Sequence, residues 1–209
     1  VSPDGRLILS GTDGTDTLDG VETLHFTDGD IQVAKDDVTG LYTLTGGTNT
    51  DTITIDPSSI EAFMIEGGAG ADALAGGLGN DTLIGGDGLD VAVYEGIQSD
   101  YRFGVDQGLL TATHIATGAI DTLDGIETIQ FADGPIGVSL DVNGGYALSG
   151  TSISDTITVS SDAGFTLQGG DGSDVLTGGA GSDTLVGGDG LDVAVYEGIQ
   201  SDYRFGVDQ

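Results

Sequence analysis

The sequence contains no cysteine and no tryptophan, and only 3 of its 209 residues are proline. Without cysteine, disulfides and thiolate metal sites are excluded, so another interaction must hold the fold in an oxidising exterior. No apolar run approaches the ~18 residues of a membrane-spanning helix, and no transmembrane segment is expected. The N-terminal stretch VSPDGRLILSG has neither a basic flank nor a long apolar core, so no signal peptide is expected within this sequence.

Basic residues are also scarce. Four lysines and arginines stand against 35 acidic residues, which gives a formal net charge of −31. This charge disfavours nucleic acid and anionic membranes as partners and favours cations. An acidic chain with few aromatics is typical of disorder. However, 37% of the residues are hydrophobic and occur in short runs such as Val91-Ala92-Val93-Tyr94, which can build a core if the repulsion is offset.

The chain consists of two tandem units. The segment DTLDGVETLHFTDG at 16–29 returns as DTLDGIETIQFADG at 121–134, and residues 85–107 return without change at 187–209. We therefore expect one unit over residues 1–107 and a second over 108–209. Because both units end on the same residue, the sequence is interpreted as a slice of a longer array.

A period of nine residues lies within each unit. Three back-to-back matches to G-G-x-G-x-D-x-U-x, where U is apolar, run over residues 67–93, and three more run over 169–195. Three repeats in phase, twice, are a strong signal. Upstream, GGTNTDTIT at 46–54 and GTSISDTIT at 150–158 keep only part of the pattern, so we expect turns of related geometry there.

The nonapeptide pattern predicts a calcium site. Its glycines permit tight turns with positive φ that bring carbonyl oxygens inward, and its aspartate adds a carboxylate. An oxygen-rich cage of irregular shape suits Ca²⁺ better than Mg²⁺. The candidate ligand residues are the aspartates Asp72, Asp81, Asp90, Asp174, Asp183 and Asp192, with the turn glycines Gly67, Gly68, Gly70, Gly76, Gly77, Gly79, Gly85, Gly86, Gly88, Gly169, Gly170, Gly172, Gly178, Gly179, Gly181, Gly187, Gly188 and Gly190.

The remaining segments predict strands. SDYRFGVD, GLLTATHI and IETIQFADG are rich in β-branched or aromatic residues and are bounded by Gly, Asp or Asn. Asn143-Gly144 marks a hairpin, and no segment keeps a helical period. The fold class is therefore all-β.

The two blocks resemble the RTX (repeats-in-toxin) nonapeptides of secreted bacterial proteins. The resemblance implies a parallel β-roll in which turns 18 residues apart stack and hold calcium between them. Asp72 would then pair with Asp90, and Asp174 with Asp192. The middle turns, which carry Asp81 and Asp183, would lie on the opposite side. There a rim site would be completed by Glu95, Asp100, Glu197 or Asp202.

Each roll contains only three nonapeptides, at 67–93 and 169–195, and is too short to bury a core alone. We therefore expect flanking antiparallel strands and hairpins to cap each roll, with Tyr94, Tyr101 and Phe103 packing in the cap. Ala92 and Ala194 replace a larger apolar residue and should thin the core at that end.

No enzyme is expected, because there is no HExxH or GxSxG motif and His25 and His114 do not recur between units. The first functional hypothesis is a calcium-dependent structural or adhesive region of a large secreted bacterial protein, outside the cell or on its surface. The RTX resemblance also implies type I secretion. The alternative is the calcium-binding C-terminal secretion and folding module of a secreted enzyme or toxin. A third is self-assembly through neighbouring copies of the unit. The expected cofactor is Ca²⁺.

Overall fold

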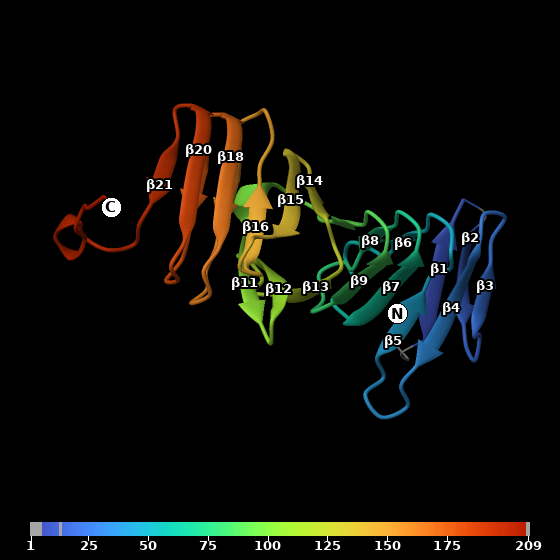
Figure 1. Cartoon of the computed structure of the whole chain (residues 1–209). Coiled ribbons are helices and arrows are strands. Elements are labelled where there is room, and N and C mark those ends of the chain that lie inside the picture. Colours follow the sequence, from blue (N-terminus) through green and yellow to red (C-terminus); the bar gives the residue numbers. More distant parts are fainter. Residues whose placement is uncertain (1–5, 13, 208–209) are drawn as a thin grey trace.

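A computed structural model describes residues 6–12 and 14–207 and is almost entirely β-structure. The last two residues of the second 187–209 copy lie outside the described residues. Within the described ranges, no helix has the length and apolarity needed to cross a membrane. Two parallel rolls follow one another along an elongated arrangement, with strands of the intervening segment between them (Figure 1).

The first roll is built from six strands in two layers. One layer contains β5 (Tyr42–Thr45), β7 (Phe63–Ala69) and β9 (Thr82–Asp87), and the other contains β6 (Thr52–Thr54), β8 (Ala73–Ala75) and β10 (Val91–Val93). The strands of each layer pair in parallel. The apolar residue of each nonapeptide points between the layers, and Leu74, Leu83 and Ala92 are fully buried there.

The second roll repeats this plan. Its layers are β16 (Tyr146–Ser149), β18 (Thr166–Gly172) and β20 (Thr184–Gly190), opposed by β17 (Thr156–Thr158), β19 (Val175–Thr177) and β21 (Val193–Val195). Leu167 and Leu176 are buried between them, whereas Leu185, nearer the end, is only partly buried. A short 3-10 helix, η2 (Gln200–Asp202), follows β21.

The N-terminal segment adds four strands. β1 (Leu7–Gly11) and β2 (Gly14–Leu18) form an antiparallel two-stranded sheet. β3 (Thr23–His25) and β4 (Asp30–Lys35) continue antiparallel onto β5 of the first roll.

The segment between the rolls contains the 3-10 helix η1 (Gln98–Asp100) and the strands β11 (Tyr101–Asp106), β12 (Leu109–His114), β13 (Ile120–Asp124), β14 (Thr128–Phe131) and β15 (Gly134–Leu140). β13 pairs in parallel with β9, and β14 pairs in parallel with β10. β12 pairs antiparallel with both β11 and β13. We call these pairings between the first roll and the following segment the internal joint.

One eight-stranded sheet crosses the joint in the order β20-β18-β16-β15-β14-β10-β8-β6. It links one layer of the first roll to one layer of the second through the antiparallel strands β14 and β15. Hydrogen bonding therefore passes over the sequence boundary at 107 and 108, which falls in the turn between β11 and β12. The expected all-β fold, with short parallel rolls capped by antiparallel strands, is confirmed.

Aromatic rings fill the joint beside Ala92. Tyr94, Tyr101 and Phe131 have ring centroids 5.0–5.7 Å apart, and Phe103 approaches Phe131 at 6.4 Å. All four side chains are buried. Rings from the capping strands therefore pack next to the small Ala92 at the end of the roll. The predicted packing role of Tyr94, Tyr101 and Phe103 is confirmed in the first roll.

Candidate calcium-binding turns

The glycine-rich turns stack on one another along each roll. Gly68 pairs with Gly86, and Gly170 pairs with Gly188, in the register of the parallel strands. Turn 67–72 therefore faces turn 85–90, and turn 169–174 faces turn 187–192. The middle turns, 76–81 and 178–183, connect the two layers at the other end of the strands.

Glycine is required by the closeness of this stacking. Gly88 has φ +152°, and a Cβ added there would run into the carbonyl oxygen of Gly70. Gly190 has the same relation to the carbonyl of Gly172. Carbonyl oxygens of one turn thus lie directly against the backbone of the next, and backbone carbonyl oxygens are among the ligands that Ca²⁺ takes in proteins.

The position-6 aspartates form a ladder between stacked turns. The backbone N–H of Asp72 donates to Oδ1 of Asp90 at 2.8 Å, and that of Asp174 donates to Oδ1 of Asp192 at 3.1 Å. On the opposite side, Phe63 and Phe165 donate in the same way to Asp81 and Asp183 at 2.8 and 2.9 Å. One carboxylate oxygen of each aspartate is therefore committed to holding the neighbouring turn.

The second carboxylate oxygen is the candidate ligand atom. Oδ2 of Asp72, Asp81, Asp90 and Asp174 is buried and has no hydrogen-bond partner. A buried, unpartnered carboxylate oxygen is strongly unfavourable unless a cation lies beside it. These four residues fit a Ca²⁺ ligand role on this ground. Asp183 is only partly buried and Asp192 is exposed, because they lie near the open end of the second roll.

The two incomplete turns, at 46–54 and 150–158, differ from the complete ones because their Oδ2 atoms accept hydrogen bonds. Oδ2 of Asp51 accepts a hydrogen bond from Gly47 N–H at 2.7 Å, and Oδ2 of Asp155 accepts one from Thr151 N–H at 2.6 Å. Protein donors therefore occupy the oxygen that is left free in the complete nonapeptides. The turns do have related geometry, as predicted, but their carboxylates are already satisfied.

Burial also perturbs the acidity of these groups. Desolvation raises the pKa of Asp81 to about 7 and that of Asp121 to about 6. It raises the pKa of Asp72 as well, with the nearby Asp90 and Asp51 carboxylates acting in the same direction. Without a cation, a proton would be the alternative source of neutralisation at these sites.

Two ladder residues escaped the sequence analysis. Asp81 N–H donates to Oδ1 of Asp121, and Asp90 N–H donates to Oε2 of Glu127, both at 2.8 Å. Asp121 therefore occupies the place beside Asp81 for which Glu95 and Asp100 were considered. Asp100 instead accepts a hydrogen bond from Ile97 N–H at the start of η1, and Glu95 is exposed.

The second-unit candidates for a rim site, Glu197 and Asp202, are likewise exposed beyond the second roll. A signal for Asp121 existed in the sequence, because ATGAIDTLD keeps the aspartate of the nonapeptide although it has lost the glycine pattern. Glu127 carries no such signal.

Backbone oxygens are essential to any cation site here. Among residues 6–12 and 14–207, no three His, Cys, Asp or Glu side chains gather closely enough to hold a metal by themselves. The arrangement therefore consists of stacked carbonyls with a buried, unpartnered carboxylate oxygen in four of the six complete turns. Such a donor set is that of a hard cation with flexible coordination.

Comparison with known families agrees with this geometry. Residues 64–92 and 166–194 match the family model of the RTX calcium-binding nonapeptide repeat (4 copies). The chain therefore contains RTX calcium-binding nonapeptide repeats in both rolls. In both rolls the RTX match covers the three complete turns and ends before Tyr94 or Tyr196, so the capping segments lie outside it. No curated protein matches the chain.

Proposed function

We propose that this chain is a calcium-dependent structural or adhesive region of a large secreted bacterial RTX protein. In this role it would order on meeting calcium outside the cell and serve as a stiff spacer in a surface stalk, surface layer or filament. The observation that carries the proposal is the set of buried, unpartnered Oδ2 atoms of Asp72, Asp81, Asp90 and Asp174. In this proposal, Asp183, Asp192 and the turn glycines are Ca²⁺ ligands as well.

Charge explains why calcium and folding would be coupled. The net charge of −31 opposes compaction, and the ladder places carboxylates one above another in buried positions. A bound Ca²⁺ supplies positive charge to the oxygens of two stacked turns. Because the unfolded chain has no such cage, the free energy of binding contributes to folding. Extracellular calcium modules bind Ca²⁺ with Kd values of about 10⁻⁴–10⁻³ M. Sites of this affinity would fill at the calcium concentration outside a cell and stay empty at that of the cytosol.

An array role is favoured over a tail attached to an enzyme or toxin by the internal joint. Strands of the segment that follows the first roll complete both of its layers through β13 and β14. A unit built in this way supports the next unit along the chain. A spacer needs this continuity, whereas a secretion and folding module needs only the calcium-dependent roll.

A calcium titration tests the proposal. Far-UV circular dichroism would follow folding of the metal-depleted chain as Ca²⁺ is added, with Mg²⁺ as the control ion. We expect β-structure to appear cooperatively with millimolar or lower Ca²⁺ and not with equal Mg²⁺. A full β spectrum in excess EGTA at neutral pH, unchanged by Ca²⁺, would refute calcium-dependent folding.

A further inference from the structure

The C-terminal end of the second roll presents uncovered apolar side chains. Its residues repeat those of the internal joint, yet Phe205 is 104% exposed while its counterpart Phe103 is 1% exposed. Tyr196 is 61% exposed, against 9% for Tyr94. The same sequence is therefore buried where the 108–131 segment packs on it and exposed on the second roll, where none of the described residues takes that place.

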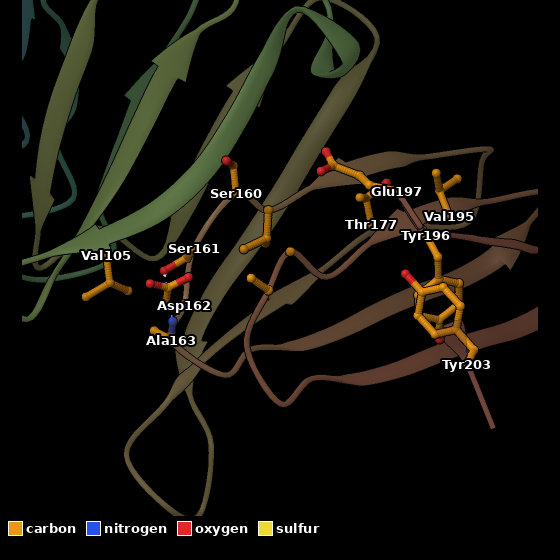
Figure 2. A pocket seen from close by; sticks show the side chains of 13 residues that line it. Val105, Ser160, Ser161, Asp162, Ala163, Thr177, Val195, Tyr196, Glu197 and Tyr203 are labelled. Carbon is orange, nitrogen blue, oxygen red and sulfur yellow. Dashed lines mark hydrogen bonds between the residues drawn. The ribbon is translucent and has the colours of Figure 1, made fainter. Parts of the chain in front are cut away.

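The aromatic pair of this end is already arranged. The rings of Tyr196 and Tyr203 lie 5.1 Å apart, as those of Tyr94 and Tyr101 lie 5.0 Å apart. Figure 2 shows the two rings side by side at the edge of a cavity, with Val105 and residues 160–163 across it. What the C-terminal pair lacks is the third ring, which Phe131 supplies in the internal joint.

Among the described residues, the N-terminal side contains a cavity that could receive such side chains. A cavity of about 630 Å³ is lined by residues 7–10 of β1 and by the 54–61 loop, together with Leu24, Leu44 and Phe63. In the second unit, the equivalent space between β12 and Val159 is filled by β11. Phe103 of β11 forms an isolated parallel β-bridge with Val159. The N–H of Ser160 donates to the Phe103 carbonyl at 2.8 Å. The repeat offset places Ile55 and Asp56 at the positions of Val159 and Ser160.

The strand edges of the two ends also correspond. β20 and β21 occupy the places of β9 and β10, whereas β2 and β3 occupy those of β13 and β14. β20 and β21 are terminal strands of their sheets, as is β3. Transferring the register of the joint pairs Leu18 with Leu185 and Leu24 with Ala194, as Leu123 pairs with Leu83 and Ile129 with Ala92.

The order of the strands in the sheets also supports the correspondence between the two ends. The second roll leaves a three-stranded sheet, β17-β19-β21, and the N-terminal side begins a run β3-β4-β5-β7-β9. Joined at β21 and β3, these strands reproduce the eight-stranded order that crosses the internal joint. Every strand would then have the same neighbour as its repeat counterpart.

Polar groups match as well. In the joint, Asp121 and Glu127 accept the N–H groups of Asp81 and Asp90. By the repeat offset, their counterparts Asp16 and Glu22 would accept from the N–H groups of Asp183 and Asp192 of another copy. The buried Gln98 amide donates to Asp155 at 2.7 Å and accepts from Thr156 at 2.7 Å. Gln200 is exposed, and the repeat offset makes Asp51 and Thr52 the counterparts of the residues that Gln98 contacts.

We infer that the C-terminal face of one copy, residues 184–207, docks on the N-terminal face, residues 7–56, of a second copy of this chain. Phe205 would enter the cavity beside β1, and Phe26, which is 39% exposed, would take the place of Phe131 against Tyr196 and Tyr203. The two faces differ, so the contact is head-to-tail and reproduces between two copies the internal joint of one copy. Because such a contact uses a different face on each copy, it can repeat along a row of copies.

This inference rests on the proposed function, since the faces exist only in the folded, calcium-loaded chain. Sedimentation of the whole chain in calcium would follow its mass over a wide concentration range, with circular dichroism on the same samples. We expect the mass to grow with concentration. The variants Phe205→Ser and Phe26→Ser each damage one exposed face and should each remain single chains. Val142→Ser, which replaces a fully exposed residue in the β15–β16 turn, is the control.

Mixing the variants gives the decisive measurement. Phe26→Ser keeps a sound C-terminal face and Phe205→Ser keeps a sound N-terminal face, so the mixture should form one-to-one dimers that grow no further. A folded wild-type chain that stays single at all concentrations would overturn the inference while leaving calcium-dependent folding intact. So would dimers that depend on Phe205 alone, because these would be symmetric. Absence of any calcium response in the dichroism would instead defeat the proposed function.

Discussion

Asp72 and Asp90 lie in register 18 residues apart, and the backbone N–H of Asp72 donates to Oδ1 of Asp90 at 2.8 Å. The hydrogen bond uses one oxygen of Asp90 and leaves Oδ2 buried without a partner. A single side chain thus has two separable tasks, one in the ladder and one toward a cation. Substitutions can distinguish them.

Asp90→Asn should retain a carbonyl acceptor for the Asp72 N–H but lose the negative charge. We expect the calcium concentration at half-folding to rise about tenfold, since a lost charge-assisted contact is worth roughly 1.5–3 kcal/mol. Asp90→Ala should be worse, because it removes both the ligand and the acceptor. Calcium titrations by circular dichroism and calorimetry measure the difference. Asp87→Asn, at an exposed position of the same turn, is the matched control and should leave the midpoint unchanged.

Acidification should favour the compact state when calcium is absent. Burial raises the pKa of Asp81 to about 7 and that of Asp121 to about 6, against 3.8 for an ordinary aspartate. At pH values between 3.8 and these raised pKa values, the folded chain therefore binds more protons than the unfolded one. The stability from protonation is present at low pH and is lost as pH rises through about 6 to 7. Dichroism of metal-depleted protein should show β-structure increasing from pH 7.5 to about pH 5.

Calcium affinity should change in the opposite sense, because protonated carboxylates are poor ligands. It should weaken as pH falls below about 7, and binding should release protons, which calorimetry in buffers of different ionisation enthalpy detects. Asp81→Asn should reduce both effects. A calcium midpoint independent of pH between 5 and 8 would contradict the assignment of these buried carboxylates as ligands.

The sequence was most informative where the period of nine is intact. Asp72 and Asp90 were paired through the RTX resemblance, which implies that turns 18 residues apart stack, and the unbroken period places these two aspartates at that separation. Asp121 and Glu127 were missed because they reach the ladder through β13 and β14, which pair in parallel with β9 and β10 across the unit boundary. Unequal loop lengths hide that register from any fixed period. Gln98 was missed because a lone glutamine carries no pattern, and only the fold brings it to Asp155.

Gly88→Ala should disrupt the first roll more severely than a glycine substitution that only strains the backbone. Its Cβ would meet the carbonyl of Gly70, in addition to an unfavourable φ of +152°. Gly118, with φ +76° and no atom near an added Cβ, is the matched control. Gly118→Ala should cost about 1–2 kcal/mol of unfolding free energy, whereas Gly88→Ala should prevent turns 67–72 and 85–90 from stacking. Denaturant unfolding in saturating calcium compares the two, and equal losses would argue against close stacking.

The two copies of one phenylalanine should differ sharply in their effect on the stability of a single chain. Phe103 is 1% exposed and bridges Val159, so it connects the cap of the first roll to the second roll. Phe103→Ala should therefore lower the unfolding free energy by about 3–5 kcal/mol, as for other buried phenylalanines. Phe205→Ala makes the same change in an identical local sequence, but its side chain is fully exposed and contributes no core in the single chain. Denaturant unfolding in calcium, at a concentration low enough to keep chains apart, should show almost no change for Phe205→Ala. Equal destabilisation by both substitutions would mean that the Phe205 side chain packs within its own chain. Phe205 would then not be available to dock on a second copy.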